Sequence, residues 1–328
     1  AMRLCFRAAV DPARTVRIEY TNQSTHPVND PMEHDMHWPY ADPAGRRILL
    51  AASEAQPLVK TGGLADVAGS LPRALRLLGH DVRLVLPAYP QAVERAEHVE
   101  KLAELEIPGQ GTRCALLRGS LPAAGGPVYL VDHPDAFERE GNPYTGPDGH
   151  DWPDNAARFA LFSRAVVALA MDRAGLDWAP ELVHTNDWQT GLVAPLLSME
   201  PDRPATLFTI HNLAYQGMFD RRTFETLGLP PALWSMDGLE FHEHLSFIKG
   251  GIAFADGVST VSPTYALEIC TPELGYGLEG LLQHRGERLA GVLNGIDYAI
   301  WDPSHDPAIP QHYNAETYEL KPRNRVAH

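Results

Sequence analysis

Short apolar runs alternate with helical patterns from Arg46 onward, and this alternation constrains the fold more than any other feature of the sequence. The strand-like runs lie at residues 46–53, 81–87, 181–187, 205–212 and 256–262. Helical patterns lie between them, for example at residues 64–77 and 155–174. The pattern predicts βαβ units, and therefore an α/β, Rossmann-like fold with a doubly wound, mainly parallel sheet that has helices on both faces.

Charge and composition narrow the class of protein. The chain has 328 residues, of which 44% are hydrophobic, so it can bury a sizeable core. Its formal net charge of −15 makes nucleic acid or an anionic membrane an unsuitable main partner. Three widely spaced cysteines follow no zinc or redox pattern, and no apolar run reaches membrane-spanning length. These features predict a cytoplasmic protein.

Changes in composition and periodicity along the sequence predict three regions. Residues 1–45 are polar, interrupted by prolines and without a sustained period, so we expect a flexible or loosely docked arm. The alternating pattern fills residues 46–303 and predicts one large lobe. Residues 304–328 follow as a tail.

Polar side chains and glycines follow several of the strand-like runs, where α/β folds gather their chemistry. The residues concerned are Lys60, Asp187, Trp188, His211 and Asn294. Simpler interpretations stay open for the last four of these residues. Asp187 could cap the following helix, Trp188 could pack in the core, and His211 could be a hydrogen-bonded structural histidine. Asn294 precedes Gly295, and that pair is a turn signal in its own right.

The segment LVKTGGLAD (58–66) places Lys60 and the pair Gly62–Gly63 just before a helical pattern. Glycines permit a positive φ or close approach to a ligand, and a helix N-terminus favours an anion. A phosphate is the obvious ligand for such a place. The alternative is a tight strand-to-helix turn with a solvated lysine.

Other site patterns are missing from the sequence. It has neither GxxxxGK[ST] nor a GxGxxG after the first strand, and no GxSxG. In FHEHLSF (241–247) the histidines are two apart, which is not the HExxH spacing of a zinc protease. We therefore expect no metal site.

Several strings together closely resemble bacterial glycogen synthases and plant starch synthases. They are SEAQPLVKTGGLADVAGSLPRAL, HTNDWQTGLVAPLL, FTIHNLAYQGMF, LSFIKGGIAFADGVSTVSPTYALEI and GLEGLLQHRGERLAGVLNGIDYAIWDP, and they run in order from about residue 46 to 303. The resemblance implies the amino-terminal lobe of a GT-B glucosyltransferase. Such an enzyme transfers glucose from a sugar nucleotide, usually ADP-glucose, to the 4-hydroxyl of an α-1,4-glucan, with retention and without a metal or other cofactor.

The resemblance also implies roles for individual residues. His211, Asp66 and Asp187 match positions near the reacting groups, and Asp187 also borders the acceptor side. Lys60, with Gly62 and Gly63, matches the place of the sugar-nucleotide donor, and Asn294 lines the same cleft. Tyr144 and Trp188 match positions that contact the glucan acceptor.

The sequence departs from this family at its end. The motifs of the second lobe, which grip the donor diphosphate, do not follow residue 303. We therefore expect an amino-terminal half that has little or no activity alone, needs the missing carboxyl-terminal lobe and could self-associate through an uncovered face. A non-catalytic glucan- or nucleotide-binding module is the alternative. A retaining transferase that acts on sucrose or a lipid-linked sugar fits the motifs less well.

Overall fold

The computed structural model describes residues 45–298 and 301–326, apart from 108, 110 and 124, together with β1 (Ala8–Val10) and β2 (Val16–Ile18). These two strands pair antiparallel. Gly45 apart, the rest of the predicted arm lies outside the described residues. The chain divides after Leu293 into a large unit and a small one, Asn294–His328, whereas the sequence places the end of the lobe at about residue 303.

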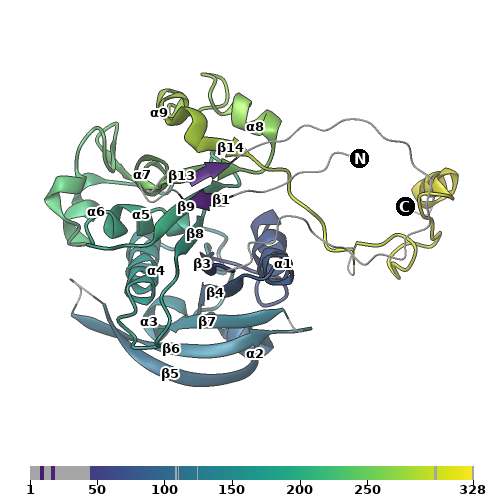
Figure 1. The fold of residues 1–328 in the computed structure, drawn as a ribbon, viewed down its shortest axis with the longest axis horizontal. Coiled ribbons are helices and arrows are strands. Elements are labelled where there is room, and N and C mark those ends of the chain that lie inside the picture. Colours follow the sequence, from purple (N-terminus) through teal and green to yellow (C-terminus); the bar gives the residue numbers. More distant parts are fainter. Residues whose placement is uncertain are drawn as a thin grey trace. The chain divides into compact units, whose positions relative to one another are not determined.

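Nine of the described strands form one sheet in the large unit (Figure 1). Their order is β14 (Leu289–Gly291), β13 (Gly257–Thr260), β9 (Ala205–Ile210), β8 (Leu182–Asn186), β3 (Arg47–Ala51), β4 (Asp81–Pro87), β7 (Gly126–Asp132), β6 (Thr112–Leu121) and β5 (Glu97–Ile107). The strands from β14 to β7 pair parallel, while β6 and β5 extend the sheet antiparallel. The predicted mainly parallel α/β fold is therefore confirmed.

Helices connect the parallel strands, and α1 and α4 lie on opposite sides of the sheet near β3 and β4 (Figure 1). The helices are α1 (Gly63–Leu77), α2 (Pro90–Arg95), α3 (Pro134–Phe137), α4 (Asn155–Ala170), α5 (Val193–Leu197), α6 (Arg221–Thr226), α7 (Phe247–Phe254), α8 (Pro263–Glu268) and α9 (Glu279–Arg285). The pattern at residues 188–199 predicts one helix, but the structure has a 3₁₀ turn, η1 (Trp188–Thr190), and then α5. The carbonyl oxygen of Phe247 passes 2.0 Å from where a Cβ of Gly191 would lie, so another chain segment crosses at the interruption.

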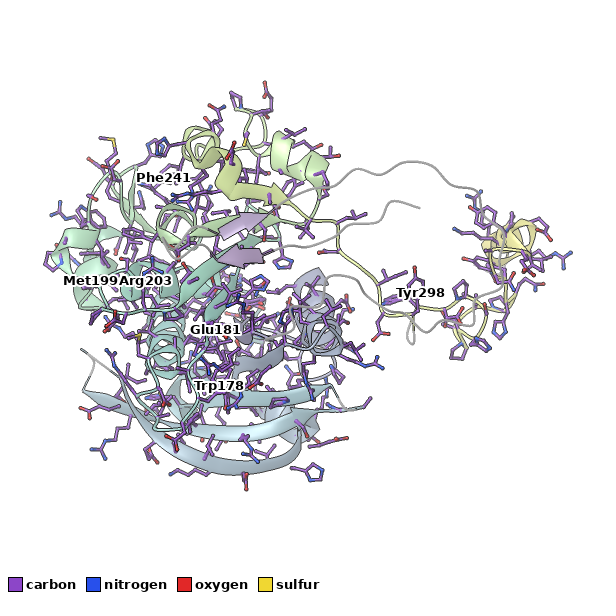
Figure 2. The ribbon with its side chains drawn as sticks, viewed as in Figure 1. Trp178, Glu181, Met199, Arg203, Phe241 and Tyr298 are labelled. Atoms are coloured by element: carbon purple, nitrogen blue, oxygen red, sulfur yellow. The ribbon has the colours of Figure 1, made fainter. Side chains whose placement is uncertain are left out.

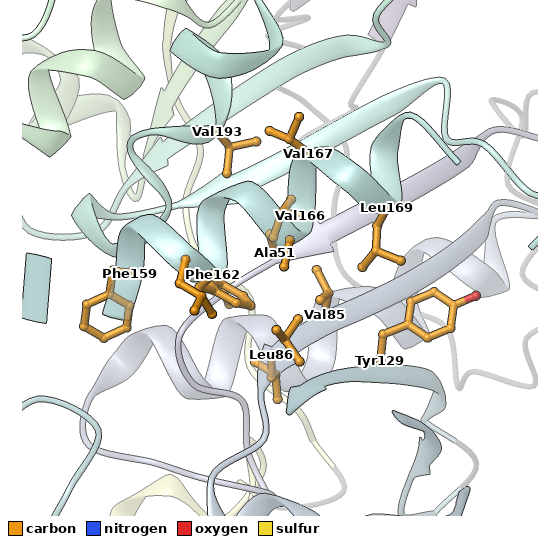
Figure 3. Packing of buried hydrophobic residues seen from close by; sticks show 14 of the residues in the cluster. Ala51, Val85, Leu86, Tyr129, Phe159, Phe162, Val166, Val167, Leu169 and Val193 are labelled. Carbon is orange, nitrogen blue, oxygen red and sulfur yellow. The ribbon is translucent and has the colours of Figure 1, made fainter. Parts of the chain in front are cut away.

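The core lies between α4 and the sheet (Figure 3). Almost every residue of α4 is buried, because α5 covers the helix on one side while β3 and β4 meet it on the other. Most of its side chains are apolar, as suits an interior helix, and its buried Arg158 and Arg164 donate to backbone carbonyl oxygens. Phe159, Phe162 and Val166 provide its large side chains. The tightly packed core fixes the positions of the strands whose ends carry the candidate site.

Polar contacts join the amino ends of several parallel strands, and Figure 2 marks Trp178 and Glu181 in this region. Trp178 Nε1 donates to Asp81 Oδ2 at 2.7 Å, and Arg46 Nη1 lies 3.0 Å from Glu181 Oε1. Arg83 stacks over the Trp178 ring, 4.1 Å from its centre. These pairs satisfy the charges at this edge of the sheet.

Smaller elements complete the two units. In the large unit, β10 (Met218–Phe219), β12 (His244–Ser246) and β11 (Glu240–Phe241) form an antiparallel sheet. The 3₁₀ turn η2 (Pro231–Leu233) lies between β10 and β11 in sequence, and η3 (Gly286–Arg288) follows α9. The small unit contains a 3₁₀ helix, η4 (Tyr318–Val326), and Asn324 hydrogen-bonds the backbone N–H and carbonyl of Gln311.

Candidate active site

The carboxyl ends of three neighbouring strands, β3, β8 and β9, bring the central predicted residues together. Ala51 pairs with Thr185, and Asn186 pairs with Thr209, so the segments that follow these strands begin side by side. Ligands of open α/β sheets bind outside this edge. The structure therefore places Asp187 and His211 where the sequence predicts a site.

His211 is held at two points by consecutive residues of the β8 end. Its backbone N–H donates to Asp187 Oδ1 at 2.7 Å, and its ring Nε2 lies 3.0 Å from Asn186 Oδ1. Burial lowers the pKa of His211 to about 4, so the ring is neutral at pH 7. The hydrogen-bonded histidine of the simpler interpretation is therefore present, and its position at the strand end leaves a ligand role open.

Asp187 has the features of a functional carboxylate. Burial raises its pKa to about 7, aided by the charge of Glu54 and opposed by hydrogen bonds from the backbone N–H groups of His211 and Asn212. Its backbone has φ +56° and ψ −179°, a conformation that costs an ordinary residue free energy. The side chain makes no cap to η1, so the capping interpretation is wrong. The carboxylate instead fixes the end of β9.

Glu54 is a site residue that sequence reasoning missed. It follows β3, is only 2% exposed, and its Oε2 accepts hydrogen bonds of 2.5 Å from both the N–H and the hydroxyl of Thr61. These bonds anchor the Lys-Thr-Gly-Gly loop to the end of β3. The signal was available, since a glutamate directly after a buried apolar run stands at the carboxyl edge of the sheet.

Lys60, Asp66 and the glycine pair meet at the start of α1. Lys60 Nζ lies 2.7 and 2.8 Å from the two carboxylate oxygens of Asp66, and both side chains are about 40% exposed. Gly62 has φ −147°, so neither glycine is needed for a positive φ. A Cβ on Gly63 would meet nothing within 4 Å, which leaves this helix N-terminus open to a ligand. Lys60 is thus paired within the chain rather than merely solvated.

Tyr144 and Trp188 lie at the same edge but are held by protein contacts. The Tyr144 hydroxyl lies 2.7 Å from Ser53 Oγ, and burial raises its pKa well above the usual value. The Trp188 ring packs edge-on against Phe159, with 5.0 Å between ring centres, and lies against Gly217. Trp188 is only partly buried, so it combines the predicted core packing with a surface that a sugar could reach.

The remaining expectations fall outside this cluster. Asn294 begins the small unit, and its role stays a prediction. Within the described ranges, no three His, Cys, Asp or Glu side chains are grouped so that they could hold a metal ion. Among the helices that the structure describes, none combines the length and apolar character needed to cross a membrane.

Comparison with known proteins gives a consistent result. Residues 47–284 match the family model described as the starch synthase catalytic domain. The chain is 56% identical over 282 residues to a glycogen synthase of Thioalkalivibrio sulfidiphilus, and 56% identical over 280 residues to glycogen synthase 1 of Methylococcus capsulatus. These matches cover 86% and 85% of the chain but 58% and 56% of the relatives, so the chain spans little more than half of their length.

A solved structure supports the same relationship. The catalytic domain of starch synthase IV from Arabidopsis thaliana, bound to ADP and acarbose, is 32% identical to the chain and superimposes with a TM-score of 0.74. The match covers 86% of this chain and 58% of that one. The predicted resemblance and the GT-B type of fold are confirmed.

Proposed function

Because the chain belongs to the starch synthase catalytic domain family, we propose that it is the amino-terminal lobe of a retaining glucosyltransferase that moves glucose from ADP-glucose to an α-1,4-glucan. The observation that carries the proposal is the arrangement at one sheet edge. A lysine at an open helix N-terminus lies in the loop that Glu54 anchors, and the strand ends beside it carry a neutral histidine and a half-buried carboxylate whose pKa is raised.

The proposed reaction exchanges one bond at the sugar for another. The bond between glucose C1 and the donor phosphate oxygen breaks, and C1 bonds to the acceptor 4-hydroxyl oxygen on the same face. The hydroxyl proton passes to the departing phosphate. Lys60 and the N–H groups of the α1 start would stabilise the phosphate charge as it develops. The proposed reaction uses no metal or other cofactor.

The other side chains would orient the sugars. His211 and Asp187 stand where hydroxyl groups of a bound glucose could be held, and Asp66 is next to Lys60. Tyr144 and Trp188 would contact the glucan, since aromatic faces suit sugar rings. Asn294 would line the donor side of the cleft.

We further propose that the chain needs a carboxyl-terminal lobe for turnover. The relatives continue well beyond the aligned region, and closure of a second lobe over the donor positions the reacting groups in two-lobed enzymes. Exposed large side chains such as Tyr215, Met236 and Tyr276 could take part in self-association when no second lobe is present. We expect the cytoplasm as the compartment, because a nucleotide sugar is the proposed donor.

The test is glucose incorporation into glycogen by the purified chain, with ADP-glucose and UDP-glucose assayed separately. We expect no turnover by the chain alone, and turnover with ADP-glucose once the carboxyl-terminal lobe of the Thioalkalivibrio relative is added. Lys60→Met should abolish the rescued activity. Lys101→Met should not, because Lys101 pairs with Glu104 on β5, the edge strand at the far side of the sheet.

Two outcomes would overturn parts of the proposal. Turnover by the chain alone contradicts the need for a second lobe. Oligosaccharide binding without any rescued transfer would favour the non-catalytic binding module instead.

A further inference from the structure

Asn186 lies between the ring of His211 and the backbone of β3. Its Nδ2 donates to the carbonyl oxygen of Ala51 at 3.1 Å, and its Oδ1 faces His211 Nε2 at 3.0 Å. The side chain is 1% exposed, so water cannot substitute for either partner. Asn186 therefore makes both of its contacts inside the protein.

These two contacts determine where the proton on the imidazole lies. A backbone carbonyl oxygen can only accept a hydrogen bond, so the amide nitrogen of Asn186 must face Ala51. The amide oxygen must then face His211, and because that oxygen can only accept, His211 Nε2 must carry the hydrogen. A neutral ring with a hydrogen on Nε2 has a lone pair on Nδ1.

Nδ1 of His211 is the ring atom left for a ligand. It accepts no hydrogen bond from any residue of the described ranges, and it is not one of the buried polar atoms that lack a partner. It is therefore open to solvent at the sheet edge. The backbone N–H of His211 is held at the same time by Asp187 Oδ1 at 2.7 Å, so the main chain that carries the ring is fixed, and turning the ring away would break its 3.0 Å contact with Asn186.

We propose that Asn186 is a positioning residue that holds His211 as the Nε2–H tautomer and so presents Nδ1 as a hydrogen-bond acceptor for a sugar hydroxyl. The sugar part rests on the proposed function, whereas the tautomer does not. His211 then acts as a neutral acceptor rather than as a cation that would repel positive charge developing on glucose. Asn186 holds the ring of His211, and the adjacent Asp187 holds its backbone N–H.

Other titratable groups around His211 are compatible with a neutral ring. His184, two residues before Asn186, is itself neutral, because burial and the charge of a protonated His211 lower its pKa to about 3. Its Nε2 lies 2.7 Å from Thr209 Oγ1. Asp187 and Glu54 are the nearby carboxyl groups: within the described residues Asp187 meets His211 at the backbone N–H, and Glu54 bonds Thr61.

The proposal is tested by ¹⁵N NMR of the chain labelled at histidine, without any sugar present. His211 signals are assigned by their loss in His211→Gln. We expect an unprotonated Nδ1 and a protonated Nε2 at pH 7. Asn186→Leu, which removes the acceptor, should give a mixture of tautomers, whereas Asn212→Ala should leave the tautomer unchanged because the Asn212 side chain accepts from Ala214 N.

A second, nearly isosteric variant guards against misfolding of the first. In Asn186→Asp a carboxylate faces Nε2, so the ring should take up its second proton at a pH about one to three units higher than in the wild type. An Nδ1–H tautomer in the wild type, or an unchanged signal in both Asn186 variants, would overturn the proposal.

Adding ADP-glucose, whose glucose the proposed function places beside His211, separates this proposal from the proposed function. We expect the sugar to shift the Nδ1 signal and not the Nε2 signal. No shift, with the tautomer as expected, would count against sugar binding at this edge while leaving the role of Asn186 intact.

Discussion

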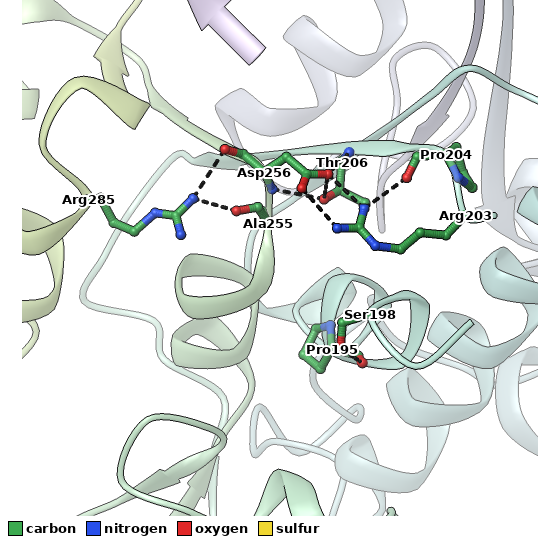
Figure 4. A network of polar contacts seen from close by, with 8 residues as sticks. All are labelled: Pro195, Ser198, Arg203, Pro204, Thr206, Ala255, Asp256 and Arg285. Carbon is green, nitrogen blue, oxygen red and sulfur yellow. Dashed lines mark hydrogen bonds and ion pairs between the residues drawn. The ribbon is translucent and has the colours of Figure 1, made fainter. Parts of the chain in front are cut away.

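An aspartate at the amino edge of the sheet and an aspartate at its carboxyl edge have pKa values that are shifted in opposite directions. At the amino ends, Asp256 accepts a bidentate ion pair from Arg203 at 2.7 and 2.9 Å and two further bonds from Thr206 (Figure 4). Burial acts to raise the pKa of Asp256, but these bonds outweigh it and the pKa is lowered. At the carboxyl ends, Asp187 has no ion pair with a described residue, and burial raises its pKa to about 7.

The difference separates an edge that stabilises the fold from the edge where we propose the chemistry. A carboxylate with a lowered pKa favours the folded state above its usual titration range. A carboxylate with a raised pKa is ionised at the expense of stability, and such groups concentrate at functional sites. The predictions below test this contrast, beginning with the largest expected loss of stability.

The strongest test removes the paired carboxylate. Asp256→Ala leaves Arg203, whose side chain is 13% exposed, without its partner, so we expect the free energy of unfolding at pH 7 to fall by roughly 3 kcal/mol. Urea unfolding measures the change. The matched control is Glu225→Ala, because Glu225 and its partner Arg221 are both about two-thirds exposed and such a pair contributes at most about 0.5 kcal/mol. A loss at Asp256 no larger than at Glu225 would remove the contrast between the edges.

The second test concerns backbone strain at the carboxyl edge. Gly217 has φ +59°, and a Cβ there would lie 2.5 Å from the Trp188 ring. We expect Gly217→Ala to cost about 2 kcal/mol, because it combines an unfavourable backbone conformation with a steric clash. Gly63→Ala is the control: its φ is not positive and the space around it is open, so its thermal midpoint should stay the same or rise slightly. An equal effect at both positions would mean that Gly217 does not support Trp188.

Sequence reasoning predicted the strands and the residues at their ends better than it predicted the contacts between side chains. Periodicity located β3, β4, β8, β9 and β13, because buried strands must be apolar wherever they lie in a parallel sheet. Strand ends then located Asp187 and His211. The bond between Lys60 and Asp66 and the anchor from Glu54 to Thr61 were not predictable, since they depend on how a loop folds back on a helix start.

The third test concerns how Asp187, which forms no ion pair with a described residue, makes stability depend on pH. Asp187 has an ordinary pKa of 3.8 and a folded-state pKa of about 7, so the folded protein holds more protons between these values and stability falls as pH rises through them. Asp187→Asn removes this fall while the amide oxygen can still accept from His211. We expect a gain of about 1 to 2 kcal/mol at pH 8, limited because the side chain is partly exposed to water, and almost none at pH 4. Urea unfolding at both pH values measures it, and a gain independent of pH would contradict a raised pKa.

The smallest expected change in stability is the most informative about ligand binding. Asp66→Asn removes an exposed ion pair, so the free energy of unfolding should change by less than about 0.5 kcal/mol. Lys60 then no longer pairs with a carboxylate, and residue 66 no longer repels a bound phosphate. If Lys60 faces the donor phosphates, the dissociation constant of ADP should fall several-fold in isothermal titration at low salt, and the effect should shrink as salt is added. Lys60→Met in the Asp66→Asn background should reverse the gain. Weaker ADP binding in Asp66→Asn would instead show that the carboxylate orients Lys60 toward the nucleotide. The ion pair would then be part of the binding surface and not a contact that the ligand must displace.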